Sequence, residues 1–149
     1  MQTGRRRIAL ITPAGFVVHV PAALKEAGLG FIATGQTQPT FDGGATAAKT
    51  LLDQHDLDAI LCMNDEIALG ALTVARDDFR LRVPRDLTVV GYGDSAMAAW
   101  PCFGLTTMRV PNAEIAKKTA QLLLERLEHP ERSPETIWVT PELIERDTH

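Results

Sequence analysis

The sequence predicts an α/β fold with a doubly wound parallel sheet, and three observations support this prediction. Short continuous apolar runs recur along the chain, as they do in strands that are covered on both faces. Segments with apolar residues at helical spacing separate these runs, and strands that alternate with helices pair in parallel. A length of 149 residues with 45% hydrophobic residues suffices for one packed domain but is short for two.

Each expected strand is a short apolar run bounded by polar residues, glycine or proline. In chain order, these runs occupy residues 8–11, 31–34, 59–62, 87–91 and 105–110. Residues 136–140 and 143–144 are expected to end the chain as extended segments.

The first two expected helices are short. Pro21 can open a helix that runs through Lys25, and Gly28 would end it. Residues 36–44 are rich in glycine, proline and other turn-forming residues, and the second helix is expected to follow them at residues 45–54.

Asn64 is expected to cap the third helix, because Asp65 and Glu66 then fall in the first turn, where the helix dipole favours negative charge. Pro111 begins a fourth, longer helix that runs to about Glu128. Its apolar stripe consists of Ile115, Leu122, Leu123 and Leu127.

Ligands of parallel α/β sheets bind beyond the carboxyl ends of the strands. The loops after Ile11, Thr34, Cys62 and Tyr92 are therefore the expected place for a binding site.

The charge balance excludes several classes of partner. Fifteen basic residues against nineteen acidic ones give a formal net charge of −4, which argues against a dedicated surface for nucleic acids or anionic membranes. The basic triplet at residues 5–7 fits a linker better than an isolated nucleic-acid patch. Two cysteines do not make a disulfide framework, and there is neither a membrane span nor a clear secretory signal, so we expect a cytoplasmic protein.

Catalytic signatures are weak. The four histidines lack metal-ligand spacing, and no glycine-rich phosphate loop is present. The segment from Gly91 to Gly93 lacks the third glycine of a dinucleotide fingerprint, and neither Ser95 nor Ser133 sits in a nucleophile elbow. We expect no enzymatic activity, no catalytic residues, no cofactor and no metal.

Several segments, in order and spacing, carry a family resemblance. They read DAILCMNDEIALGAL at residues 58–72, LRVPRDLTVVGYGD at 81–94, LTTMRVP at 105–111 and PELIERDT at 141–148. Together they resemble the effector-binding region of the lactose-repressor/galactose-repressor family of bacterial transcription regulators. The resemblance is continuous over residues 43–148, and residues 7–12 resemble the strand that opens the family's carboxyl-terminal lobe.

This resemblance implies one lobe of a periplasmic-binding-protein-like fold, in which two lobes clamp a small ligand. It divides the chain into a linker or tail (1–7), the carboxyl-terminal lobe (8–104), a crossover segment with the long helix (105–135) and terminal extended segments (136–149). The amino-terminal lobe and the DNA-binding headpiece are missing, so the chain is expected to be a fragment that cannot bind an operator on its own. Its long helix must then repack on its own sheet or exchange with a second chain, because burying each apolar side chain of its stripe is worth about 1.5–3 kcal/mol.

The resemblance also implies a set of ligand-binding residues. Asn64 would bond sugar hydroxyls, although it also suits a plain helix cap. Leu61 would present an apolar group to the ligand or serve the core, and Phe41, in the loop before Gly43, would stack on a sugar or lie as a lid over the helix. Tyr92 and Asp94 complete the expected set.

Gly93 stands where many members of the family place a ligand-contacting aspartate. A missing carboxylate lowers the electrostatic cost of binding an anion, and the Gly-aromatic-Gly-Asp run is similar to that of the family's gluconate-type branch. No arginine lies between Arg7 and Arg76 to receive such an anion, which weakens this interpretation.

The sequence therefore predicts the ligand-sensing lobe of a transcription regulator that binds a small sugar or sugar acid and forms a homodimer. A sugar-binding module of a transport system is the first alternative, and a small α/β enzyme is the least favoured.

Overall fold

The computed structural model of the protein describes residues 4–15 and 24–149 and confirms the predicted α/β fold. Its strands form one sheet in the order β2-β1-β3-β4-β5-β6. The pairings among the first five strands are parallel, and β6 is antiparallel to β5. The strands are β1 (Ile8–Pro13), β2 (Phe31–Thr37), β3 (Ala59–Cys62), β4 (Thr88–Gly93), β5 (Thr106–Arg109) and β6 (Glu142–Ile144).

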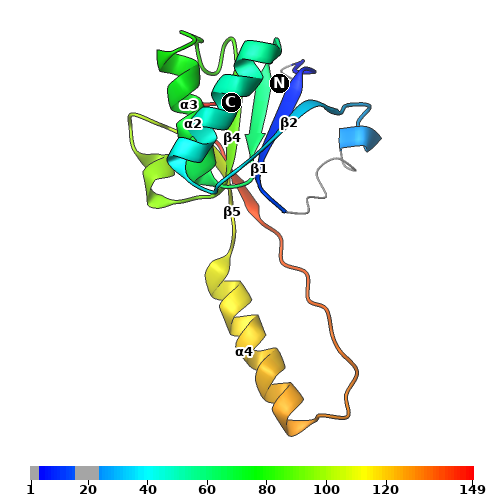
Figure 1. The fold of residues 1–149 in the computed structure, drawn as a ribbon. Helices are drawn as coiled ribbons and strands as arrows, with labels where there is room; N and C mark the ends of the chain where they lie inside the picture. Colours follow the sequence, from blue (N-terminus) through cyan, green and yellow to red (C-terminus); the bar gives the residue numbers. More distant parts are fainter. Residues whose placement is uncertain (1–3, 16–23) are drawn as a thin grey trace.

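The helices α2 (Phe41–Gln54) and α3 (Asp65–Asp77) lie side by side on one face of the sheet (Figure 1). A short 3-10 helix, η1 (Ala96–Ala99), follows β4, and α4 (Asn112–Glu128) follows β5. Residues 21–23 of the first expected helix lie outside the described residues.

One helix boundary differs from the prediction. The second helix was expected from residue 45, but α2 begins at Phe41. The cause is the Thr40 side chain, which accepts a hydrogen bond from the backbone N–H of Gly43 and caps the helix. The glycines at positions 43 and 44, which resembled turn residues, are thus helical.

The core lies between the sheet and the two adjacent helices. Gly44 of α2 faces the backbone of Ile67 in α3, and Gly70 of α3 faces the backbone carbonyl of Phe41 in α2, so a Cβ atom at either glycine would overlap the other helix. This close approach allows α2 and α3 to cover the sheet together. The buried cluster beneath them includes Ala9, Ile11, Ala48, Leu51, Ile60, Ala68, Leu72 and Val89.

The end of the chain is anchored in the sheet. The fully buried hydroxyl of Thr148 donates a hydrogen bond to the carbonyl of Val89 and accepts one from the backbone N–H of Thr106. The backbone N–H of Val89 donates to the Thr148 carbonyl, 3.0 Å away. The C-terminal residues therefore bridge β4 and β5 at the point where these two strands begin.

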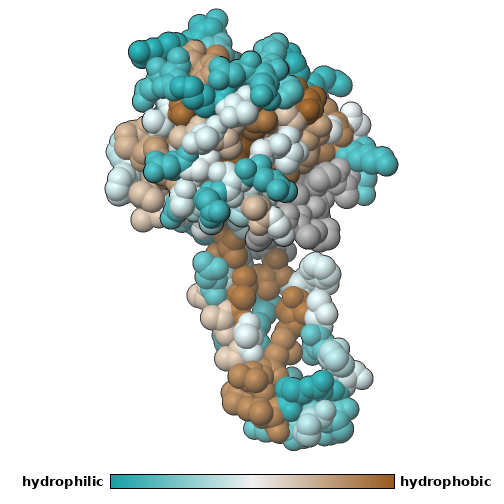
Figure 2. Space-filling model, viewed as in Figure 1, coloured by the Kyte–Doolittle hydropathy of each residue, from teal (hydrophilic) through white to brown (hydrophobic). Residues whose placement is uncertain are grey.

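Residues 110–141, which we call the excursion, extend away from the sheet between β5 and β6. Figure 1 shows α4 and the returning chain as a long arm that leaves the body at one end, opposite the two termini. All residues of α4 are described and none is buried, so the alternative in which this helix repacks on its own sheet is wrong. Figure 2 shows the apolar surface gathered along the arm, where Leu127 is 72% exposed and Trp138 is 88% exposed.

Candidate functional site

A shallow depression lies at the edge of the sheet where β3 and β4 end, as expected for a parallel α/β fold. Its volume is about 250 Å³. Of the predicted site residues, the fold brings Asn64 and Tyr92 together at this depression. The full lining consists of Pro39, Asn64, Asp65, Glu66, Tyr92, Gly93 and Ser95.

Asn64 has the predicted cap geometry. Its side-chain oxygen accepts a hydrogen bond from the backbone N–H of Ile67, at 2.7 Å. Its amide nitrogen makes only a long contact of 3.5 Å with the carbonyl of Pro39. The cap therefore uses the oxygen and leaves the NH₂ group, a donor, at the depression, so one side chain can serve the helix and a ligand at the same time.

Asp65 is the buried polar centre of this region, and its side chain ties three elements together. The carboxylate accepts hydrogen bonds from the backbone N–H of Ser95 and from the hydroxyl of Thr107 in β5. Gly91 leaves the space for it, since a Cβ atom there would overlap the Asp65 carboxylate. The sequence indicates the role of Asp65 at the start of the helix but carries no signal for these long-range partners.

The charge of Asp65 also affects its surroundings. Burial raises the pKa of the Cys62 thiol, and the nearby negative charge of Asp65 raises it further. This thiol is therefore not a nucleophile at neutral pH.

The backbone explains the glycine at position 93. Gly93 has a φ of +134°, a conformation that disfavours any side chain. A Cβ atom there would meet the Asp65 carboxylate only at 3.6 Å, so the backbone conformation rather than crowding favours glycine. Next to it, the ring of Tyr92 is partly exposed over the depression.

Asp94 lies just beyond the depression, and its carboxylate is engaged by two arginines. Arg109 Nε lies 2.7 Å from one carboxylate oxygen, and Arg146 Nη2 lies 2.6 Å from the other. Burial by itself raises the pKa of Asp94, but the hydrogen bonds from Arg146 and Arg109 outweigh it, so the net pKa is lowered. Both arginines come from the last third of the chain, and sequence reasoning did not place them at this edge.

Leu61 and Phe41 are not among the residues that line the depression. Leu61 is half-buried within β3, where it pairs with Leu10 of β1 and Val90 of β4. The prediction of a loop position for Phe41 was wrong, because this residue is the first of α2, and its side chain is partly exposed.

The described residues contain no group of three or more His, Cys, Asp or Glu side chains that could hold a metal ion. Among the helices in the described part of the chain, none combines the length and apolar character needed to cross a bilayer. What the edge offers chemically is a set of hydrogen-bond donors and acceptors beside an aromatic ring, which suits binding of a polar ligand.

Comparisons with known proteins agree with this geometry. Residues 1–149 match the family described as periplasmic binding protein-like domain. The chain is 34% identical to the HTH-type transcriptional repressor PurR of Escherichia fergusonii over 134 residues, which cover 89% of this chain and 38% of that protein.

Solved structures give the same picture. The transcriptional regulator CelR–cellobiose complex superposes with a TM-score of 0.88 at 30% identity, over 99% of this chain and 48% of that one. A LacI family regulator of Enterococcus faecium with bound ribose superposes with a TM-score of 0.79 at 26% identity, over 97% of this chain and 57% of that one.

The chain thus spans about half the length of its relatives or less, and the match to the family extends over all of its residues. On the fold, the edge of the sheet and these matches, the chain belongs to the periplasmic binding protein-like family, and the proteins that it resembles include transcriptional regulators.

Proposed function

We propose that the chain is the ligand-sensing lobe of a transcription regulator and binds a small sugar or sugar acid at the depression around Asn64 and Tyr92. The observation that carries this proposal is the division of labour in Asn64, whose oxygen caps α3 while its NH₂ group remains at the depression. An amide donor beside an aromatic ring suits a polyhydroxylated ligand. No step of chemistry is needed, because binding alone can shift a conformational equilibrium.

The known ligands of similar proteins support a sugar. CelR is described in complex with cellobiose, and the Enterococcus faecium regulator with ribose. Within the depression, Gly93 contributes no carboxylate, and that of Asp65 is committed to Ser95 and Thr107. A gluconate-like acid is our specific candidate, and the negative charges of two lining residues, the buried Asp65 and the exposed Glu66, oppose an anion.

A thermal-shift panel of D-gluconate, cellobiose and ribose tests the proposal. A ligand at 100 times its Kd stabilises a protein by about 2.7 kcal/mol, which for a chain of this size raises the melting temperature by roughly 5–11 °C. A shift with gluconate alone supports a sugar acid as the ligand. A shift with cellobiose or ribose alone indicates that the ligand is a neutral sugar instead. No shift with any of the three at 100 mM contradicts the proposal for sugars of this class.

The variant Asn64→Asp separates the two roles of this residue. Aspartate caps a helix as well as asparagine does, so stability is expected to change by less than about 0.5 kcal/mol. The NH₂ donor is lost, so the thermal shift with the active sugar is expected to disappear. If the variant keeps the full thermal shift, Asn64 does not contact the ligand.

We also propose that two copies of the chain associate through the exposed leucines of α4. This is the alternative in which the long helix packs against a second chain rather than on its own sheet. Leu123, Leu124 and Leu127 are each more than half exposed, and burial of such a side chain is worth about 1.5–3 kcal/mol. Sedimentation at increasing concentration is expected to show dimers, and Leu127→Glu is expected to weaken them at least tenfold. Gln121→Glu adds the same charge at another exposed position of α4 and is the control.

The proposal extends to the full-length protein to which this chain belongs. We infer that the full regulator acts in the cytoplasm and contacts DNA through a headpiece outside this chain. A sugar-binding module of a transport system is the alternative, and the reading frame upstream of Met1 distinguishes them: a helix-turn-helix sequence supports the regulator, and a signal peptide supports transport.

A further inference from the structure

The chain crosses between the sheet and the excursion twice. It leaves at the end of β5 and returns at the start of β6, while α4 buries none of its residues. Since α4 is not packed into the body, the orientation of the excursion depends on the groups that hold the two strands where they cross (Figure 1).

One carboxylate links the outgoing crossing to the chain just beyond the returning strand. Asp94 binds Arg109, the last residue of β5, at 2.7 Å and Arg146, two residues after β6, at 2.6 Å. Arg109 also lies 3.4 Å from Glu142, the first residue of β6. The ion pairs thus link the outgoing strand, the returning strand and the loop after β4.

The two arginines differ in how firmly they are held. Arg146 donates a second hydrogen bond, of 2.7 Å, to the carbonyl of Leu105, and its backbone N–H donates to the hydroxyl of Thr106. Arg109 is about half exposed, and the side-chain contacts of its guanidinium are with Asp94 and Glu142. Loss of Asp94 therefore removes the stronger of the two charge contacts of Arg109.

The loop that carries Asp94 is itself fixed. Asp94 has a φ of +54°, its backbone N–H points to the Thr107 hydroxyl at 3.4 Å, and the following Ser95 donates its backbone N–H to the buried Asp65. With 9% of its side chain exposed, the Asp94 carboxylate is a rigid anchor rather than a mobile surface charge. Surface ion pairs contribute little, but a partly buried pair with two arginines at good distances is stronger.

We propose that Asp94 is a positioning residue that sets the orientation of the excursion relative to the sheet, by holding Arg109 at the outgoing crossing and Arg146 just beyond the returning strand β6. Tyr92 and Gly93, the last two residues of β4 and the direct neighbours of Asp94, line the depression, so the candidate site and the strands that carry the excursion share one anchor. This inference goes beyond the proposed function, because it concerns the geometry of the chain whether or not a sugar binds.

Pulsed electron paramagnetic resonance can measure this orientation. The native Cys102 is exposed and takes one spin label, Cys62 is buried, and Glu128→Cys places the second label at the exposed end of α4. Dilution with unlabelled chain removes distances between copies. In this doubly labelled protein, Asp94→Asn is expected to at least double the width of the distance distribution. Asparagine, like aspartate, tolerates a positive φ, so the loop conformation is preserved.

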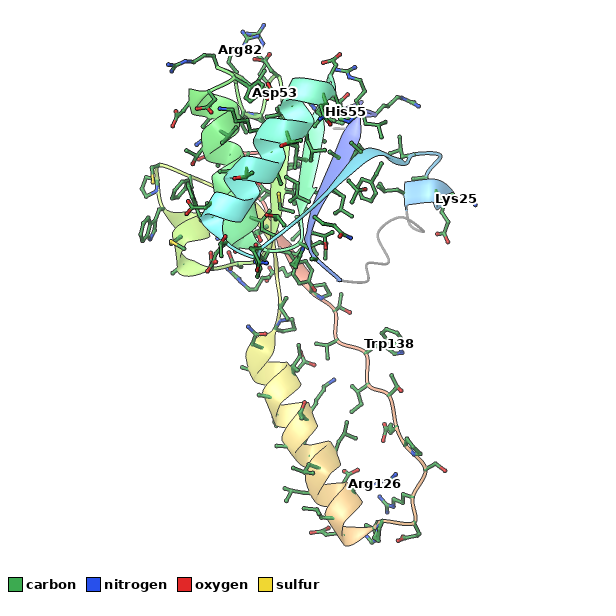
Figure 3. All side chains as sticks on the ribbon, in the orientation of Figure 1. Lys25, Asp53, His55, Arg82, Arg126 and Trp138 are labelled. Atoms are coloured by element: carbon green, nitrogen blue, oxygen red, sulfur yellow. The ribbon has the colours of Figure 1, made fainter. Side chains whose placement is uncertain are left out.

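Asp86→Asn is the matched control. Asp86 also binds an arginine, Arg82, through both carboxylate oxygens, but this pair lies elsewhere. Figure 3 shows Arg82 at one end of the body. The excursion, which carries Trp138 and Arg126, extends from the opposite end. The control is expected to leave the distribution unchanged.

An Asp94→Asn distribution as narrow as that of the control would overturn the proposal. A lowered melting temperature in that case would show that Asp94 stabilises the fold without orienting the excursion. Should Asp94→Asn fail to fold by circular dichroism, Arg109→Gln removes a single, half-exposed partner, and an unchanged width in that variant overturns the proposal as well. Because no sugar is present, these outcomes are independent of the thermal-shift panel.

Discussion

Replacing Asp65 with alanine tests how far the candidate site depends on one buried carboxylate. Asp65 is 3% exposed and accepts hydrogen bonds from Ser95 and Thr107. Truncation leaves two donors without their acceptor, at about 1–3 kcal/mol each, and removes a favourable charge from the first turn of α3, at about 0.3–1 kcal/mol. The Thr107 hydroxyl can rotate toward another acceptor, so we expect a loss of about 3 kcal/mol.

Urea and thermal unfolding measure this loss. For a chain of this size, about 3 kcal/mol lowers the melting temperature by roughly 6–12 °C. Glu66→Ala is the matched control, because Glu66 is the next residue in the same helical turn but is exposed. It loses only the dipole interaction, which is worth less than about 1 kcal/mol. Equal losses in the two variants would refute the role assigned to Asp65.

Three further predictions concern packing, the chain end and pH. Gly70→Ala is expected to lower the free energy of unfolding in urea by about 1–2 kcal/mol, because the overlap of its Cβ atom with the α2 backbone outweighs the gain in helix propensity. Gly30→Ala is the control: its Cβ atom would point into open space, so the free energy of unfolding is expected to change by less than about 0.5 kcal/mol. Thr148→Val is expected to lower the free energy of unfolding by about 2 kcal/mol, because the backbone N–H of Thr106 and the carbonyl of Val89 lose their hydrogen-bond partner. Thr148→Ser keeps the hydroxyl and is expected to retain most of this stability. Equal losses in the two variants would contradict the hydrogen-bonded role of Thr148. Hydrogen bonds from Arg82 lower the pKa of Asp86 from 3.8 to about 2, so an NMR titration should show this carboxyl charged in the folded protein until the pH falls toward 2. The stability that this pair contributes is present above pH 3.8 and is lost progressively as the pH falls from 3.8 to about 2, because the unfolded chain takes up the proton first. Arg82→Gln should return the midpoint toward 3.8, and an unchanged midpoint would contradict the pairing.

Local patterns predicted the main elements correctly. The apolar runs at residues 8–11, 59–62 and 87–91 mark β1, β3 and β4 because strands inside a parallel sheet are buried on both faces. Asn64 marks the start of α3 because capping depends only on neighbouring residues. The start of α2 was missed because its glycines favour turns in isolation and are helical here through the Thr40 cap and the contact with α3.

The candidate site was predictable only in part. Asn64 follows β3 and Tyr92 lies at the end of β4, so their meeting at one edge of a parallel sheet could be expected from chain order. The commitment of Asp94 to Arg109 and Arg146 could not, because these partners are 15 and 52 positions away and no periodic pattern links them. For the same reason, no local pattern indicates that arginines reach this edge at all.

By itself, the sequence determined the α/β class, the order of strands and helices, the family resemblance and the cap at Asn64, since each depends on residues close together in the chain. Only the tertiary structure decided that α4 stands away from the sheet, that Thr148 bridges β4 and β5, and that Asp94 links β5 to the chain beyond β6. Those features arise from contacts between distant segments, whose partners are selected by the packing of the whole sheet rather than by local preference.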